Sequence, residues 1–158
     1  MRAAPTQLTD FDPEATVAAS GGSKKLVQQA LAADATAMET KLMSDIQRLE
    51  TNEKLSRVVI HQGVAYLSGL TADDRSADAF GQTLQVLRKA DALLGKAQSD
   101  KSKILSAQIW MRDINEFDEM NRAWITWLEG TVPPARATVG ATFALPDIHV
   151  EIQFTAAV

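Results

Sequence analysis

The sequence predicts an α+β fold, in which two helices cover one face of a sheet and the element order is β-β-α-β-α-β-β. Three observations support this prediction. Two short apolar runs flank a glycine turn within residues 57–69. Two segments of helical periodicity, near residues 76–95 and 113–130, enclose one apolar strand-like segment. Two stretches that alternate apolar and polar residues, 135–145 and 147–156, close the chain.

The N-terminal third differs in character from the rest of the chain. Residues 1–22 predict a flexible lead, because prolines and a glycine pair interrupt them and no hydrophobic period is visible. Residues 23–49 predict a helix that Ser23 caps. Its apolar stripe consists of Val27, Leu31, Met38, Leu42, Ile46 and Leu49. We expect this helix to lie against the main domain, residues 50–158, or against a neighbouring subunit; a partner-binding helix is the alternative.

The middle of the chain predicts a hairpin, a helix and a strand. The segment RVVIHQGVAYLSG, residues 57–69, predicts a β-hairpin that turns at Gly63. A helix follows, with Ser76 as its expected N-cap and Gly95 as its end. The segment KILSAQIWM, residues 103–111, is apolar at both odd and even positions, which is typical of a strand covered on both faces.

The second helix carries an aromatic stripe. Gly130 ends this helix, and Pro133 and Pro134 prevent it from continuing. Its tryptophans are interpreted as packing residues rather than as platforms for nucleic-acid bases. The stripe consists of Phe117, Met120, Trp124, and Trp127 or Leu128.

The closing strands place one arginine and one glutamate on their polar sides. In the first strand, Ala135, Ala137 and Val139 alternate with Arg136 and Thr138. The second strand alternates in the same way and carries Glu151 on its polar side. We expect the apolar sides to lie under the helices and the polar sides to share the other face. Because the central strand is apolar on both sides, self-association is expected to cover that second face.

Composition excludes several classes of function. The net charge of −4 argues against binding of a nucleic-acid backbone by charge. No apolar run is long enough to span a membrane, and the acidic N-terminal residues do not resemble a secretory signal, so a cytoplasmic protein is expected. The chain has no cysteine. His61 and His149 stand outside any zinc-binding motif, so no metal site is expected.

From about residue 48 to 158 the sequence resembles the Rid family, also called YjgF/YER057c/UK114 or "endoribonuclease L-PSP". The stretches that carry the resemblance are VAYLSG, GQTLQVLRKADALL, SKILSAQIWMRDINEFDEMNRAW, PPARATV and VEIQFTAA, in this order along the chain. The resemblance implies a chorismate-mutase-like fold. It also implies a homotrimer whose sheets form a central barrel, with three clefts between subunits. In family members of known activity, these clefts hydrolyse 2-imino or enamine acids to 2-oxo acids and ammonia, without a cofactor or a metal.

The resemblance assigns roles to six residues of this sequence. An arginine binds the substrate carboxylate, and a planar guanidinium suits that task because it donates two hydrogen bonds at once. An acidic residue orients the attacking water, and the remaining positions line or support the cleft. The corresponding residues are Arg136 for the carboxylate, Glu151 for the water, Ser68 and Gly69 for the lining, Asn121 as a support of the cleft, and Thr138, which replaces a common family cysteine.

Two departures from the family pattern leave the activity open. Leu55 stands where the better-studied deaminases have a tyrosine, and Leu70 replaces a polar residue, so a more apolar cleft is expected. A deaminase and a non-catalytic trimer that binds small carboxylates are therefore both considered. Endoribonuclease or translation-inhibitor activity, which the family also bears in its names, is disfavoured by the acidic charge.

Overall fold

A computed structural model of the chain describes residues 24–38 and 45–158. The chain divides into two compact units, Met1–Leu42 and Met43–Val158. The lead predicted at residues 1–22 lies outside the described residues. In the first unit, residues 24–38 form a helix whose side chains are all exposed.

The predicted end of the N-terminal helix at residue 49 is wrong. Gln47–Thr51 instead form strand β1 of the second unit. Leu49 pairs with Val58 of the next strand and packs against the hydrophobic core, so its apolar side chain serves a sheet rather than a helix stripe. The expected cap, Ser23, lies outside the described residues.

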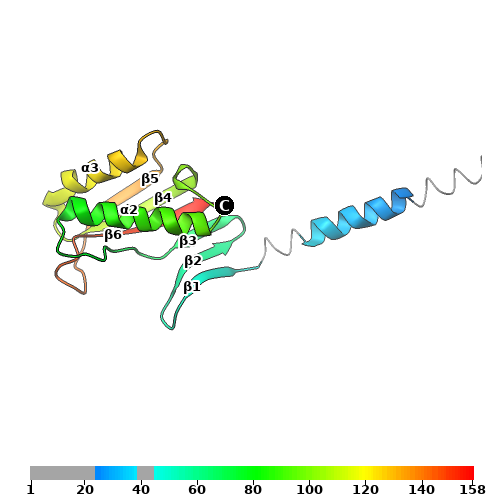
Figure 1. Ribbon diagram of the computed structural model, residues 1–158, viewed down its shortest axis with the longest axis horizontal. Coiled ribbons are helices and arrows are strands. Elements are labelled where there is room, and N and C mark those ends of the chain that lie inside the picture. The colour runs from blue at the N-terminus through cyan, green and yellow to red at the C-terminus, as the bar shows by residue number, and fades with distance from the viewer. Residues whose placement is uncertain (1–23, 39–44) are drawn as a thin grey trace, which may run out of the picture. The chain divides into compact units, whose positions relative to one another are not determined.

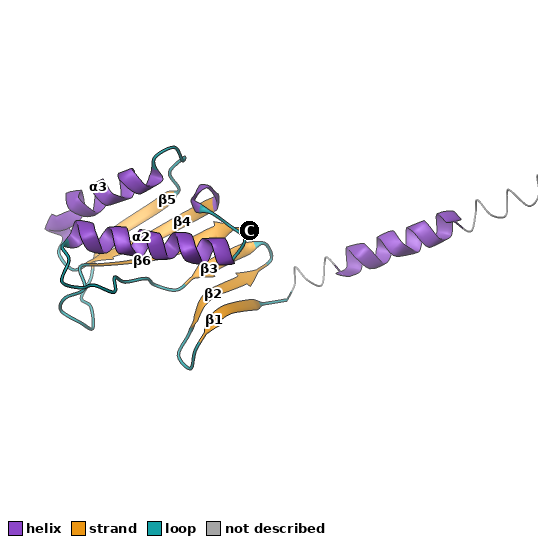
Figure 2. Cartoon of the chain, viewed as in Figure 1, coloured by secondary structure: helices purple, strands orange, loops and turns teal. Residues whose placement is uncertain are grey.

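The second unit is built on a six-stranded sheet with the order β1-β2-β3-β6-β4-β5 (Figure 2). All neighbouring strands are antiparallel except β4 and β5, which are parallel and joined through helix α3. The α+β fold class is confirmed, with one strand more than the sequence predicted. The strands are Gln47–Thr51 (β1), Ser56–His61 (β2), Val64–Leu67 (β3), Ile104–Met111 (β4), Ala135–Gly140 (β5) and Val150–Ala157 (β6).

Helices α2, Ala79–Lys96, and α3, Phe117–Leu128, lie on the same face of this sheet (Figure 1). We call this the helix face and the opposite side the open face. Asp78 caps α2, because its carboxylate accepts the N–H of Gly81 at 2.8 Å. The predicted cap, Ser76, lies two residues too early, and its hydroxyl donates to Asp74 instead.

The hydrophobic core lies between the helix face and the two helices. Trp124 of α3 stacks on Phe154 of β6, with ring centroids 6.2 Å apart and an interplanar angle of 2°. Burial of this core is the main driving force for folding. Its largest fully buried side chains include Leu67, Leu70, Leu87, Leu94, Ile109, Met111, Met120, Ile152 and Phe154.

A buried glutamine fixes the segment that leads into β6. The carbonyl oxygens of Arg75, Ala77 and Asp147 share the two N–H donors of the Gln82 amide, at 2.9 to 3.0 Å from its nitrogen. Its own carbonyl oxygen accepts the N–H of His149 at 3.0 Å. Such a fully used side chain holds its neighbours in one arrangement. The position of Glu151, two residues after His149, is therefore well defined.

The predicted assignment of faces for β5 is wrong. Arg136 pairs in register with Ala107 of β4, which itself pairs with Phe154, and both of these side chains are buried on the helix face. Arg136 therefore lies on the helix face, whereas Ala135 and Val139 are exposed on the open face. Period-2 alternation separates two sets of side chains but does not say which set faces the core.

Candidate functional site

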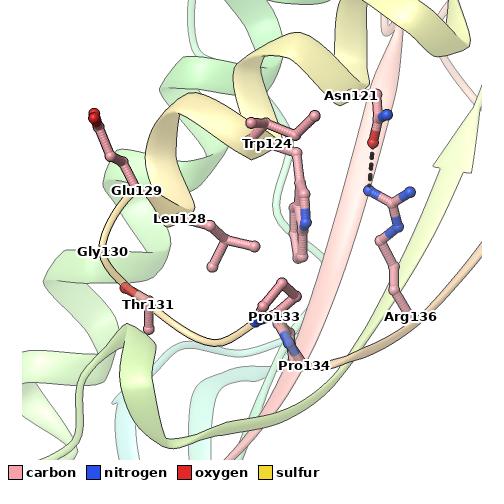
Figure 3. A pocket seen from close by; sticks show the side chains of 10 residues that line it. Asn121, Trp124, Leu128, Glu129, Gly130, Thr131, Pro133, Pro134 and Arg136 are labelled. Carbon is pink, nitrogen blue, oxygen red and sulfur yellow. Dashed lines mark hydrogen bonds between the residues drawn. The ribbon is translucent and has the colours of Figure 1, made fainter.

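An apolar hollow of about 460 Å³ lies between the second half of α3, the following loop and the start of β5 (Figure 3). Arg136 and Asn121 stand at one end of it (Figure 3). The side chains and backbone that line it belong to Asn121, Trp124, Ile125, Leu128, Glu129, Gly130, Thr131, Pro133, Pro134 and Arg136.

Arg136 is held by α3 from two sides. Its Nη1 donates to Oδ1 of Asn121 at 2.9 Å. Its Cζ lies 5.2 Å from the ring centroid of Trp124 and 5.7 Å from that of Phe117, so the guanidinium also makes cation–π contacts. These contacts restrict the rotamers of a long side chain before any ligand arrives.

The charge of Arg136 is available to an anion. Partial burial lowers its pKa, because desolvation disfavours the charged form. The guanidinium remains charged at neutral pH, since the ordinary pKa of arginine lies far above neutrality. Within the described part of the chain, no carboxylate forms an ion pair with it. A ligand carboxylate would fit the N–H groups that Asn121 leaves unused.

Thr138 lies two residues beyond Arg136 on the same side of β5. It pairs with Ile109, which is buried on the helix face. The Thr138 hydroxyl is buried and has no hydrogen-bond partner among the described residues. Leaving a buried hydroxyl unpaired costs free energy. Arg136, Asn121 and Thr138 together are called the arginine group below.

Glu151 belongs to a second group, around the end of β3. Its neighbours on the same strand, Val150 and Ile152, are buried on the helix face, so Glu151 projects from the open face. Its Oε1 lies 1.9 Å from the position that a Cβ on Gly69 would take. Glycine is thus required for the carboxylate to lie where it does.

Ser68 precedes Gly69, and its buried hydroxyl likewise has no partner among the described residues. Ser68, Gly69 and Glu151 are called the glutamate group. The structure therefore brings the six predicted residues together as two sets of three. The expectation that Arg136 and Glu151 share one face of the sheet is wrong, because they project from opposite faces.

The structure also locates the two departures from the family pattern. Leu55 lies in the turn between β1 and β2 and is 42% exposed. Leu70 bridges to Ile152 and is buried in the core, so the prediction that it lines a cleft is wrong. A position directly after a strand end can still point inward when the backbone irregularity there changes the alternation.

Sequence reasoning missed the aromatic support of the arginine and the role of the two prolines in the hollow. Phe117 and Trp124 were predicted as core residues, and their ring faces toward Arg136 leave no separate signal in a helical period. His149, which stands outside any zinc-binding motif, is half-buried, and its Nδ1 lies 2.8 Å from Oε2 of Glu116.

Neither a metal-site cluster nor a membrane-spanning helix is found among the described residues. Among residues 24–38 and 45–158, no three or more histidine, aspartate or glutamate side chains are grouped as a metal site. In the same part of the chain, none of the helices has the length and apolar character that crossing a membrane requires.

The family model described as Ribonuc_L-PSP, endoribonuclease L-PSP, matches residues 45–158. A RutC family protein of Haemophilus ducreyi is 41% identical over 113 residues, which cover 72% of this chain and 97% of that protein. The RutC family protein YoaB of Escherichia coli K12 is 42% identical over 113 residues, covering 72% and 98% of the two chains.

The same likeness is found among solved structures. A crystal structure of a member of the YjgF protein family from Neisseria meningitidis superposes with a TM-score of 0.70. Its sequence is 36% identical, and the superposition covers 73% of this chain and 96% of that one.

Proposed function

The chain belongs to the endoribonuclease L-PSP family, also called the Rid, YjgF or RutC family, and from that premise we propose that it hydrolyses 2-imino and enamine acids. The products are 2-oxo acids and ammonia. One observation carries the proposal: Arg136 is a positioned, charged guanidinium at the rim of a hollow, without an ion-pair partner among the described residues. It suits the carboxylate that every such substrate carries.

The proposed site is composed from two copies of the chain. Arg136 and Glu151 project from opposite faces of one sheet, so one copy does not bring them to the same substrate. Arg136 and Thr138 of the arginine group lie on β5, which is the last strand of the sheet and therefore leaves an edge for another molecule. We propose a homotrimer in which the arginine group of one subunit meets the glutamate group of the next.

The open face supports an assembly of this kind. Tyr66 is 48% exposed there and Val139 is 44% exposed. Trp110 pairs with both Glu151 and Val139 and is only half-buried. Aromatic and apolar side chains on a sheet face are typical of a surface that another subunit covers.

The proposed reaction is hydrolysis by positioning. Arg136 holds the substrate carboxylate, and Glu151 accepts a hydrogen bond from a water molecule beside the imine carbon. The water oxygen adds to that carbon, and the C–N bond of the resulting carbinolamine then breaks. The water supplies the oxygen of the 2-oxo acid, and its two protons leave with the nitrogen. An iminium substrate thus yields ammonium, and the charges balance.

The unpaired hydroxyls of Thr138 and Ser68 have a place in this scheme. Each would find a hydrogen-bond partner in the amine that forms at the reacting carbon. The reaction needs no cofactor, because water is the only second reactant. The proposed location is the cytoplasm, where pyridoxal-phosphate enzymes release such imines.

The experiment that tests the proposal replaces Arg136 by alanine. An amino-acid oxidase generates the imine, and ammonia release is followed with and without the protein. We expect Arg136→Ala to lower kcat/KM for 2-iminopropanoate by about a hundredfold or more, since a charge-assisted bidentate contact is lost. Arg122→Ala is the matched control, because Arg122 also lies on the α3 side of the molecule but pairs with Glu119 outside the hollow.

The oligomer is measured alongside the activity by sedimentation. Full activity of Arg136→Ala in an intact oligomer would contradict the assignment of Arg136 as the residue that binds the substrate carboxylate. Arg136→Lys retains the positive charge but not the planar guanidinium that donates two hydrogen bonds to a carboxylate. We therefore expect this variant to keep only part of the activity.

The second candidate function is non-catalytic binding of small carboxylates in the same clefts. Leu55, which stands at the position of the deaminase tyrosine, is the observation that favours it. Calorimetry with 2-oxobutanoate separates the two candidates: binding that depends on Arg136, without acceleration of imine hydrolysis, would establish the binder. Endoribonuclease activity is the third candidate, and degradation of RNA by a nuclease-free preparation would establish it.

A further inference from the structure

The hollow beside Arg136 is polar at one end and apolar along its length. Arg136 and Asn121 form the polar end, while Trp124, Leu128 and Pro133 form the wall next to it (Figure 3). Glu129 lies at the opposite end of the hollow from Arg136 (Figure 3). A molecule whose carboxylate contacts Arg136 would therefore place its next atoms against an apolar wall.

The size of the hollow exceeds what the smallest imino acids require. Its volume is about 460 Å³, and small-molecule sites in proteins commonly span roughly 300 to 1,000 Å³. 2-Iminopropanoate has only a methyl group beyond the reacting carbon. It would leave the exposed apolar surface that Ile125 and Pro133 contribute to the hollow in contact with water, whereas an isobutyl or benzyl group would cover that surface.

The wall is also held in place by the core. The Trp124 side chain is stacked on Phe154, and its ring centroid lies 5.5 Å from that of Trp127. Leu128 is only 5% exposed. The proline pair has fixed φ angles and stiffens the facing loop. A wall built in this way does not close around a small ligand, so its shape is set before binding.

We propose that this hollow is a side-chain pocket that makes the protein prefer 2-imino acids with large apolar side chains, branched-chain or aromatic. This inference rests on the proposed function, because it names the substrate class of the same site. Each methylene group in an apolar pocket improves specificity by roughly 10- to 200-fold. We expect kcat/KM for 2-imino-3-phenylpropanoate or 2-imino-4-methylpentanoate to exceed that for 2-iminopropanoate by about tenfold or more.

One exposed side chain allows the pocket to be altered without disturbing the core. Ile125 lines the hollow and is 63% exposed, so Ile125→Asp brings a carboxylate to the rim with little effect on folding. We expect this variant to lower the ratio of kcat/KM for the phenyl substrate to that for 2-iminopropanoate by about tenfold. Ile114→Asp is the matched control, since Ile114 is 49% exposed outside the hollow, and its ratio should equal that of the unaltered protein.

Binding of stable carboxylates tests the pocket independently of hydrolysis. Calorimetry compares 3-phenylpropanoate with propanoate, using the unaltered protein, Ile125→Asp and Ile114→Asp. Tighter binding of 3-phenylpropanoate than of propanoate, lost only in Ile125→Asp, supports the pocket. It does so even if no imine is hydrolysed, because absence of hydrolysis would contradict only the proposed function.

Two outcomes would overturn the inference. One is equal kcat/KM for the three imines together with equal binding of the two carboxylates. The other is a change of sedimentation in Ile125→Asp with no change in either ratio, because a second copy of the chain would then occupy the hollow.

Discussion

The arginine group and the glutamate group are built in different ways on opposite faces of one sheet. Arg136 is held by contacts, since a hydrogen bond that it donates to Asn121 and two aromatic rings fix its guanidinium. Glu151 depends instead on free space, because Gly69 has no Cβ and leaves room for the Glu151 carboxylate. The first group depends on the packing of α3, and the second depends on one backbone position.

Because of this difference, different substitutions would disturb the two groups. A destabilising substitution in the core beneath α3 would displace Arg136 and leave Glu151 in place. A single added methyl group at Gly69 would do the reverse. If both groups act on one substrate, each kind of damage lowers the same activity through a different subunit.

The largest expected effect comes from mixing two inactive variants. Arg136→Ala and Glu151→Gln are each expected to be nearly inactive alone. In a mixed oligomer, about a quarter of the clefts would combine an intact arginine group from one subunit with an intact glutamate group from its neighbour. Ammonia release after co-expression of differently tagged chains measures the recovery.

The control for this experiment is a chain that carries both substitutions, co-expressed from two differently tagged copies. It should stay inactive. Absence of recovery in verified mixed oligomers of the two single variants would contradict a cleft composed from two subunits.

The next largest effect is on stability, through the support of the arginine group. Trp124→Ala removes a ring that is 4% exposed and stacked on Phe154. We expect the free energy of unfolding to fall by about 3–5 kcal/mol, as for other large-to-small changes in cores. Urea denaturation followed by circular dichroism measures it. Ile125→Ala, at the adjacent exposed position, should change it by less than about 0.5 kcal/mol; equal losses in both variants would contradict this account of the core.

A smaller effect is expected from the hydrogen bond that positions Arg136. Asn121→Ala removes its acceptor and should lower kcat/KM about tenfold, since hydrogen bonds to charged groups contribute about 1.5–3 kcal/mol and water replaces part of the loss. Arg136→Ala should then lower kcat/KM by a smaller factor in the Asn121→Ala background than in the unaltered protein. Asn115→Ala, which removes only the side-chain hydrogen bond from Asn115 to Asp113, is the control and should leave kcat/KM unchanged.

Much of this molecule was predictable from residue patterns, and the failures have physical causes. Helices α2 and α3 were predicted from their long apolar stripes and from the glycines near their C-terminal ends, Gly95 and Gly130. Strand β1 has five residues, QRLET, with one apolar side chain in the middle, and that side chain also fits the spacing of the preceding helical stripe. Pairing with β2 decides its conformation, and a pairing partner is not visible in local periodicity.

The candidate site shows the same limit. The residue types were predicted, and six of them lie in two local groups. Their division between faces was not predicted, because the apolar set of β5 is small, consisting of Ala135, Ala137 and Val139. Aromatic rings on α3 accept the Arg136 side chain on the helix face instead. Registers between distant strands, such as that of Arg136 with Ala107, decide which set faces inward.

The smallest change in structure tests the glutamate group. Gly69→Ala adds a Cβ where Oε1 of Glu151 now lies, so the carboxylate must move. Because the displaced atoms are the far end of a flexible side chain, we expect the free energy of unfolding to change by less than about 1 kcal/mol. The catalytic activity should nevertheless fall severalfold, since the water would lose its oriented acceptor.

Gly95→Ala is the matched control for this last prediction. Gly95 lies in α2, and a Cβ there meets no atom within 4 Å. Alanine is intrinsically more favourable than glycine in a helix, by about 0.5–1 kcal/mol. Gly95→Ala should therefore raise stability slightly and leave activity unchanged. If Gly69→Ala also leaves activity unchanged, Glu151 does not need its present position, and the glutamate group would be a packing feature of the sheet rather than half of a cleft.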